Sequence, residues 1–206
     1  MQTSGLMGGL FRVCEWITKF ACVNVLWVAF TLVGFIVFGF APSTIALFSI
    51  VRKWILGESE FSILSTFWSI YKREFRKANL LWLLFMTVFT LMYIDWVLIN
   101  SMQGTFYYFM LGCFIICAML LTVVLIYIFP VYVHFEGSIF HYLKSALLLG
   151  ASFPFRTFVM IISVVTCVFL GLLFPGVGIL FLGSGISFAL MYLSYSLFTS
   201  VTPKGE

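Results

Sequence analysis

Two stretches of this 206-residue chain carry no charged residue over lengths that are unusual for a soluble helix. One lies between Lys19 and Arg52, and the other lies between Arg156 and Lys204. A helix that crosses the roughly 30 Å of hydrocarbon in a bilayer needs about 20 apolar residues. Only helices and closed barrels satisfy their own backbone hydrogen bonds in lipid, so these runs predict membrane-spanning helices.

The composition supports the same class. Hydrophobic residues make up 63% of the chain and charged residues 9%, with a mean hydropathy of +1.17. About a quarter of the residues are charged in a typical soluble domain. A chain of this size cannot hide so much apolar surface in a water-soluble core. We therefore predict an all-α integral membrane protein built as a helical bundle.

Five apolar runs are long enough to span a bilayer, and together they make residues 1–206 a single membrane domain. The predicted spans cover residues 21–41, 79–99, 105–129, 157–174 and 177–198. The sequence "GFA" at the end of the first run has the small-x-small pattern of a signal-peptide cleavage site. The apolar region before it is too long for a typical signal peptide, which favours a retained span.

Lys and Arg are divided unequally between the two sides of these five spans. Two of them, Arg12 and Lys19, precede the first span, and the other nine fall on the opposite side: Arg52, Lys53, Lys72, Arg73, Arg76, Lys77, Lys144, Arg156 and Lys204. Short loops rich in Lys and Arg stay in the cytoplasm. This predicts a bacterial plasma-membrane protein with its N-terminus outside and its C-terminus cytoplasmic. A re-entrant or sixth segment within residues 1–56 remains an open alternative.

A short helix is predicted directly after the first span, over residues 42–56. Pro42 suits the first turn of a helix, and Gly57 suits a left-handed C-cap. At 1.5 Å per residue the helix would be about 22 Å long, which is too short to span. We expect it at the cytoplasmic interface, with Trp54 at headgroup depth and Arg52 and Lys53 facing anionic lipid.

A second cytoplasmic helix, basic and amphipathic, is predicted over residues 61–77. Its apolar face repeats every three or four residues, through Phe61, Leu64, Trp68, Tyr71, Phe75 and Ala78. Such a helix either anchors in the interface or docks against a partner, and the sequence leaves both readings open. The residues predicted to contact lipid or a partner are Arg52, Lys53, Trp54, Phe67, Trp68, Tyr71, Arg73, Phe75, Arg76 and Lys77.

The same region carries a family resemblance. The stretches "NVLWVAFTLVGFIVFGFAPSTIALFSIVRKWILGESEF" and "FWSIYKREFRKANLL" resemble the signature of the YesL-like family of bacterial integral membrane proteins, a domain-of-unknown-function family. The matching positions are Asn24, Leu26, Trp27, Pro42, Ser43, Thr44, Ala46, Leu47, Arg52, Lys53, Trp54, Phe67 and Trp68. Ser43 stands where the family pattern leads us to expect Ala, and the likeness is strongest over roughly the first 80 residues.

The resemblance implies a role linked to carbohydrate, because such proteins are found in gene neighbourhoods for complex-sugar uptake and breakdown. It assigns no activity and no catalytic residue. We therefore expect a non-enzymatic accessory or regulatory component, acting on the membrane subunits of a sugar importer. The alternative is a small secondary transporter or channel-like protein that acts on its own.

Two polar residues within the predicted spans are candidates for a functional site. Asp95 is the ionisable one, and a carboxylate in a membrane is a candidate substrate or proton site by default. It lies near the outer end of its span beside Trp96, which favours an interfacial acid. Asn24 is better explained by a hydrogen bond between helices than by a binding site.

No pattern in the chain predicts catalysis or a bound cofactor. The stretch "HFEGSIFH", with His134, Glu136 and His141, lacks the spacing of a metal-binding motif. The five cysteines fall mostly in apolar runs without ligand spacing. We expect no catalytic residue, no metal, no cofactor and no nucleic-acid partner; the bilayer is the expected environment, and the oligomeric state is left open.

Overall fold

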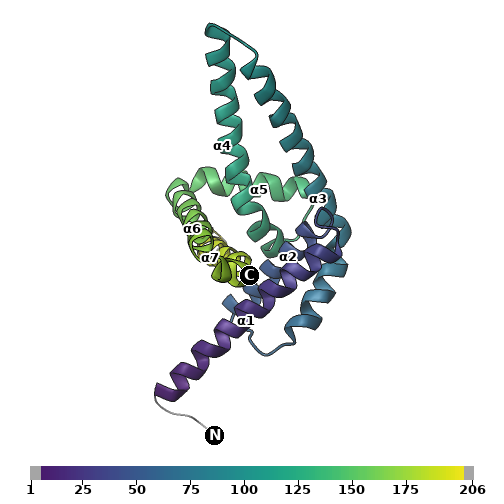
Figure 1. Cartoon of the computed structure of the whole chain (residues 1–206), viewed down its shortest axis with the longest axis vertical. Coiled ribbons are helices and arrows are strands. Elements are labelled where there is room, and N and C mark those ends of the chain that lie inside the picture. The colour runs from purple at the N-terminus through teal and green to yellow at the C-terminus, as the bar shows by residue number, and fades with distance from the viewer. Residues whose placement is uncertain (1–5, 202–206) are drawn as a thin grey trace.

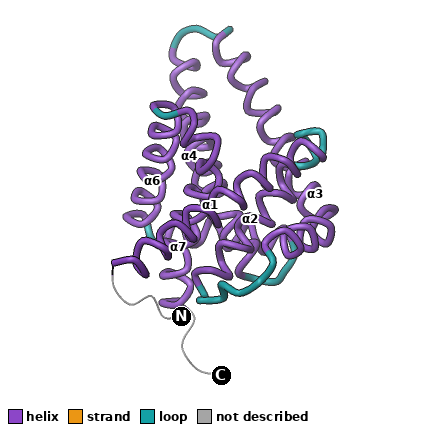
Figure 2. The backbone as a smooth tube through the Cα atoms, turned by 60° about the horizontal axis from the view of Figure 1, so that its bottom comes forward, coloured by secondary structure: helices purple, strands orange, loops and turns teal. Residues whose placement is uncertain are grey.

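The computed structural model describes residues 6–201, and all regular secondary structure in that range is helical (Figures 1 and 2). Lys204, which contributed to the charge count, lies outside the described residues. The helices are α1 (Leu6–Val33), α2 (Phe40–Ile55), α3 (Ile63–Asn100), α4 (Thr105–His134), α5 (Ile139–Ser152), α6 (Pro154–Leu173) and α7 (Pro175–Val201).

Five of these helices are long and apolar enough to cross a membrane. They are α1, α3, α4, α6 and α7, so the predicted number of spans and the all-α class are confirmed. The bounds differ most at the first span, because α1 begins at Leu6 and ends at Val33 instead of covering 21–41. The segment expected as an N-terminal tail is therefore largely helical.

The chain reverses at residues 34–39, inside the run that was predicted to continue the first span. Phe35 and Ile36 adopt positive φ angles of 54° and 64°, and the Ile36 N–H donates to the Thr31 carbonyl over 2.9 Å. This tight turn requires Gly34 and Gly39, because a Cβ on either glycine would collide with backbone atoms of the turn. Hydropathy could not reveal the turn, since its side chains are as apolar as those of the span.

Helix α2 is buried within the protein, so the prediction of an interfacial helix over residues 42–56 is wrong. An unbroken run from Ala41 to Phe48 is buried, and α2 packs against α1, α3, α4 and α7. Trp54 is 5% exposed and its ring contacts Trp16 and Phe20, so it faces the protein interior and not the lipid headgroups. A helix that is apolar on nearly all sides is stabilised best by burial.

Helix α2 runs antiparallel to α1. Phe40, at its start, contacts Trp27, whereas Trp54, near its end, contacts Trp16. Lys19 of α1 therefore lies toward the same end of this helix pair as Arg52 and Lys53. The predicted orientation assumed that the chain crosses the membrane once between Lys19 and Arg52. The turn at 34–39 reverses the chain between these two residues, so that assumption no longer holds. The re-entrant segment that the sequence left open corresponds to α2.

Helix α3 is continuous from Ile63 to Asn100, so the predicted amphipathic helix and the predicted span 79–99 form one element. Ala78, at the expected junction, is fully buried. The predicted end of the preceding helix at Gly57 is confirmed, because α2 ends at Ile55 and Gly57 has a φ of +88°. Glycine tolerates this left-handed conformation without a Cβ penalty.

The outer halves of α3 and α4 form a hairpin that extends away from the other helices, and α5 lies across α4 before α6 begins (Figure 1). Helix α5 was not predicted; it lies between the predicted spans 105–129 and 157–174. Helices α6 and α7 pack closely where glycines meet: a Cβ on Gly178 would lie 2.7 Å from the Gly171 carbonyl oxygen. Small residues at this contact let the backbones of the two helices approach closely.

Candidate functional site

A polar cavity of about 610 Å³ lies where α2, α3, α4 and the start of α5 meet. Cavities of this size commonly hold small molecules. Its walls are formed by Ile45, Ser49, Arg73, Glu74, Lys77, Tyr132, Val133, Phe135, Glu136, Gly137 and Tyr142. Charged and hydroxyl side chains therefore meet in a protein that is otherwise mostly apolar.

Helix α3 positions a linked pair of charges at this cavity. The Arg73 Nε donates to Glu74 Oε1 over 2.8 Å, and the hydroxyl of Tyr132 on α4 donates to Glu74 Oε2 over 2.9 Å. Each oxygen of Glu74 is thus paired, once with a cation and once with a neutral hydroxyl. The carboxylate holds α3 and α4 together at the cavity wall.

Lys77 lies one turn further along α3 and points to the linker between α4 and α5. Its Nζ donates to the Gly137 carbonyl and to the Tyr142 hydroxyl, both over 2.8 Å. The ammonium also lies over two rings, 5.3 Å from the centroid of Tyr132 and 4.7 Å from that of Tyr142. Lys77 was expected to face lipid or a partner, but it instead ties α3 to this linker.

Phe67 and Tyr71, also predicted to contact lipid or a partner, face the interior. Phe67 is fully buried and stacks on Phe30 of α1 with ring centroids 5.2 Å apart. The Tyr71 hydroxyl is within 3.4 Å of the Phe30 carbonyl oxygen, to which it donates, and the partly buried Phe75 packs beside Tyr71. The apolar face of the predicted amphipathic helix thus packs against this protein's own α1 and α2.

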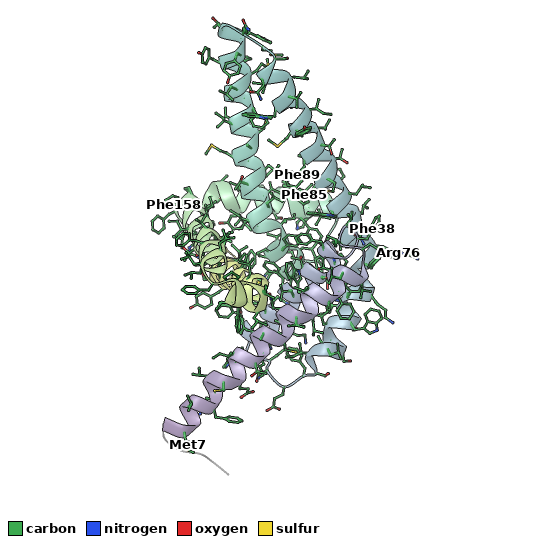
Figure 3. All side chains as sticks on the ribbon, in the orientation of Figure 1. Met7, Phe38, Arg76, Phe85, Phe89 and Phe158 are labelled. Carbon is green, nitrogen blue, oxygen red and sulfur yellow. The ribbon has the colours of Figure 1, made fainter. Side chains whose placement is uncertain are left out.

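An exposed part of the predicted contact surface remains on the outer side of α3. We call Trp68, Lys72, Arg73 and Arg76 the basic stripe, because all four are exposed. The Lys72 ammonium lies 4.7 Å from the ring centroid of Trp68. Arg76 projects at the outer edge of the molecule in the view of Figure 3.

The two basic residues of α2 differ in their surroundings. Lys53 pairs with Glu58 over 3.0 Å and lies over the Phe61 ring. The Arg52 Nε is buried without a hydrogen-bond partner in the described part of the chain. His134, which belongs to the stretch "HFEGSIFH", is partly buried and stacks on Phe198 with centroids 4.3 Å apart.

Asn24 forms the interhelical contact that its position in a span predicted. Its Nδ2 donates to the Ile179 carbonyl over 2.7 Å, and its Oδ1 accepts from the Ser184 N–H over 3.0 Å. Asp95 does not share this site. It is exposed on the outer half of α3, next to Trp96, whose ring contacts Phe114 of α4.

Sequence reasoning identified Arg73 and Lys77 but missed the cavity that they line. Tyr132, Glu136 and Tyr142 lie between the predicted spans 105–129 and 157–174, where no element was predicted. The available signal was that these polar side chains follow directly after a predicted span. Within residues 6–201, no three His, Cys, Asp or Glu side chains gather in a way that could hold a metal ion.

Comparison with known proteins places the chain among bacterial relatives. Residues 20–96 match the family described as "protein of unknown function, DUF624". Over its whole length the chain is 37% identical to the uncharacterized protein YteU of Bacillus subtilis (strain 168), covering 92% of YteU. It is 34% identical to YesV and 30% identical to YesL of the same organism, over 81% and 78% of this chain and 80% and 75% of those proteins. No solved structure matches the chain.

Proposed function

This chain belongs to the YesL-like DUF624 family, and on that premise we propose that it is a non-enzymatic accessory or regulatory protein linked to carbohydrate uptake. It would act by docking against the membrane subunits of a sugar importer. The carbohydrate link comes from the family resemblance, and the docking role rests on one structural observation, the basic stripe.

The basic stripe has the composition of a protein contact surface. Tryptophan and arginine contribute more binding energy to interfaces than other residue types do. Trp68, Arg73 and Arg76 are exposed, whereas Phe67 and Tyr71 of the same helix are buried inside the protein. We propose that a partner helix or loop covers these three side chains.

The stripe can be tested by exchanging arginine for lysine. Arg73→Lys combined with Arg76→Lys keeps the charge but removes the planar guanidinium groups that pair bidentately and stack. We expect loss of the co-purifying importer subunits and poor growth on complex polysaccharide, with normal amounts of protein in the membrane. The matched control is Arg12→Lys, the same exchange at an exposed position on α1.

A silent double exchange would favour the alternative of a lipid anchor, because headgroup attraction depends mainly on charge. In that case Trp68→Ala alone should weaken the association of α3 with the membrane surface. If neither change affects partner binding or growth, the basic stripe is not a docking site.

The polar cavity favours a second candidate function, a small transporter or channel-like protein. It lies beside α3 and α4, two of the candidate spans, and a polar cavity next to spans is what a solute site requires. Uptake of labelled sugar into vesicles that contain only this chain would support transport. Uptake that appears only when importer subunits are added would support the accessory role.

We also propose an orientation in the bacterial plasma membrane. The loop before α3 and the C-terminus lie in the cytoplasm, and the α3–α4 turn lies outside. The N-terminus was expected outside from the charge count, but we place it with the cytoplasmic loop, because α2 runs antiparallel to α1 and Lys19 lies toward the end that carries Arg52 and Lys53. In a variant without the five native cysteines, cysteines at Ser59 and Gly9 should be shielded from impermeant thiol reagents in intact cells, and a cysteine at Gln103 should react. Labelling at Gly9 together with shielding at Ser59 would return the N-terminus to the outside. Labelling at Ser59 but not at Gln103 would reverse the proposed orientation.

A further inference from the structure

The four charged side chains at the polar cavity sum to no net formal charge. Arg73 and Lys77 are the cations, and Glu74 and Glu136 are the carboxylates. A cavity with equal numbers of positive and negative side chains does not favour a simple anion over a simple cation. A ligand that carries one charge of each sign can satisfy both kinds of wall.

The α3 side of the cavity retains hydrogen-bond donors. Two of the three N–H groups of Lys77 are used by Gly137 and Tyr142, which leaves one. The Tyr142 hydroxyl accepts from Lys77 Nζ and from the Gly137 N–H, so its own proton is available to donate. The hydrogen bond of Arg73 to Glu74 uses Nε, which leaves the terminal nitrogens. Cationic donors grouped in this way are suited to an oxyanion.

The α4–α5 linker provides the complementary acceptor. Glu136 lines the cavity, is exposed, and forms no hydrogen bond or ion pair with another residue in the described part of the chain. An ionised carboxylate only accepts hydrogen bonds. Its natural partner is therefore a cationic N–H donor, which a ligand can supply.

We infer that this cavity binds a small zwitterion, in which a phosphate-type oxyanion and a primary ammonium group are joined by a short linker. The oxyanion lies at Arg73, Lys77 and Tyr142, and the ammonium lies at Glu136. The headgroup of phosphatidylethanolamine and free phosphoethanolamine share this chemistry. The inference does not depend on the proposed role at a sugar importer.

The first test measures thermal unfolding of the purified full-length chain in detergent with O-phosphoethanolamine as the probe. We expect the midpoint to rise by about 2–4 °C once the probe exceeds its Kd several-fold. Phosphocholine, which has no N–H on its nitrogen, should stabilise less. Inorganic phosphate and ethanolamine, which each carry one of the two charges, should also stabilise less.

Two variants assign the ends of the ligand. Glu136→Gln should weaken phosphoethanolamine binding by about tenfold and abolish its advantage over phosphocholine, because a charge-assisted hydrogen bond is lost. Arg73→Gln should weaken both probes. Glu60→Gln and Lys144→Gln, at exposed positions outside the cavity lining, should leave binding unchanged.

Native mass spectrometry then distinguishes the two sources. After reconstitution with equal amounts of phosphatidylethanolamine and phosphatidylglycerol, retention of phosphatidylethanolamine by the wild type but not by Glu136→Gln identifies a lipid headgroup. Binding of the soluble probe without lipid retention identifies a free zwitterion. The inference is overturned if O-phosphoethanolamine gives no stabilisation, if all four probes act equally, or if Glu136→Gln binds as the wild type does.

Discussion

Replacement of Gly39 by valine should destabilise the protein by about 3 kcal/mol or more, because the new side chain would be forced into backbone atoms. A Cβ at Gly39 would collide with the Thr31 carbonyl oxygen and lie 2.7 Å from the Phe30 carbonyl oxygen. Neither atom can move without opening the turn between α1 and α2. The thermal midpoint in detergent should fall by about 6–12 °C, at 2–4 °C per kcal/mol for a chain of this length.

The matched control is Gly9→Val on α1. A Cβ there meets no other atom within 4 Å, so the same exchange should leave the midpoint nearly unchanged. If Gly39→Val behaves like the control, the chain does not make the tight turn at residues 34–39. The burial of α2 would then need another explanation, because this turn places α2 inside the bundle.

Asn24→Leu should be the next most damaging change, with a loss of about 2 kcal/mol. Leucine is similar in size to asparagine but apolar, so it removes the acceptor of the Ser184 N–H and the donor to the Ile179 carbonyl. In the hydrocarbon region no water replaces these bonds. The thermal midpoint should fall by about 4–8 °C.

Asn100→Leu serves as the control for the asparagine exchange. Asn100 is exposed, and its side chain donates to the Trp96 carbonyl within its own helix. This variant should unfold within about 1–2 °C of the wild type, as surface changes usually do. If the thermal midpoint of Asn24→Leu also stays this close to that of the wild type, the contact between α1 and α7 contributes little to stability.

Local features of the sequence were enough to predict several parts of the structure. Long apolar runs identified five spans, because the length of hydrocarbon sets the length of the helix. Gly57 marked the end of α2, because its left-handed conformation strongly favours glycine. Asn24 was expected to bond another helix, because a polar amide in lipid needs a partner.

Hydropathy could not tell which apolar segments face lipid and which face protein. Lipid tails are as apolar as a leucine side chain, so burial in the bundle and exposure to the bilayer select similar residues. Helix α2 was therefore assigned to the interface although it is buried in the bundle. The same ambiguity hid the turn at 34–39 and the inward face of Phe67 and Tyr71.

The sequence by itself determined the class, the five spans and the presence of Arg73 and Lys77 near one end of a span. Only the tertiary structure decided what these two residues do. Lys77 meets Tyr142 across 65 positions of the chain, and Glu74 meets Tyr132 across 58. Such contacts depend on how α3, α4 and α5 pack, and periodicity describes only neighbours on the same helix. The polar cavity exists because that packing brings the charges of α3 against the linker after α4.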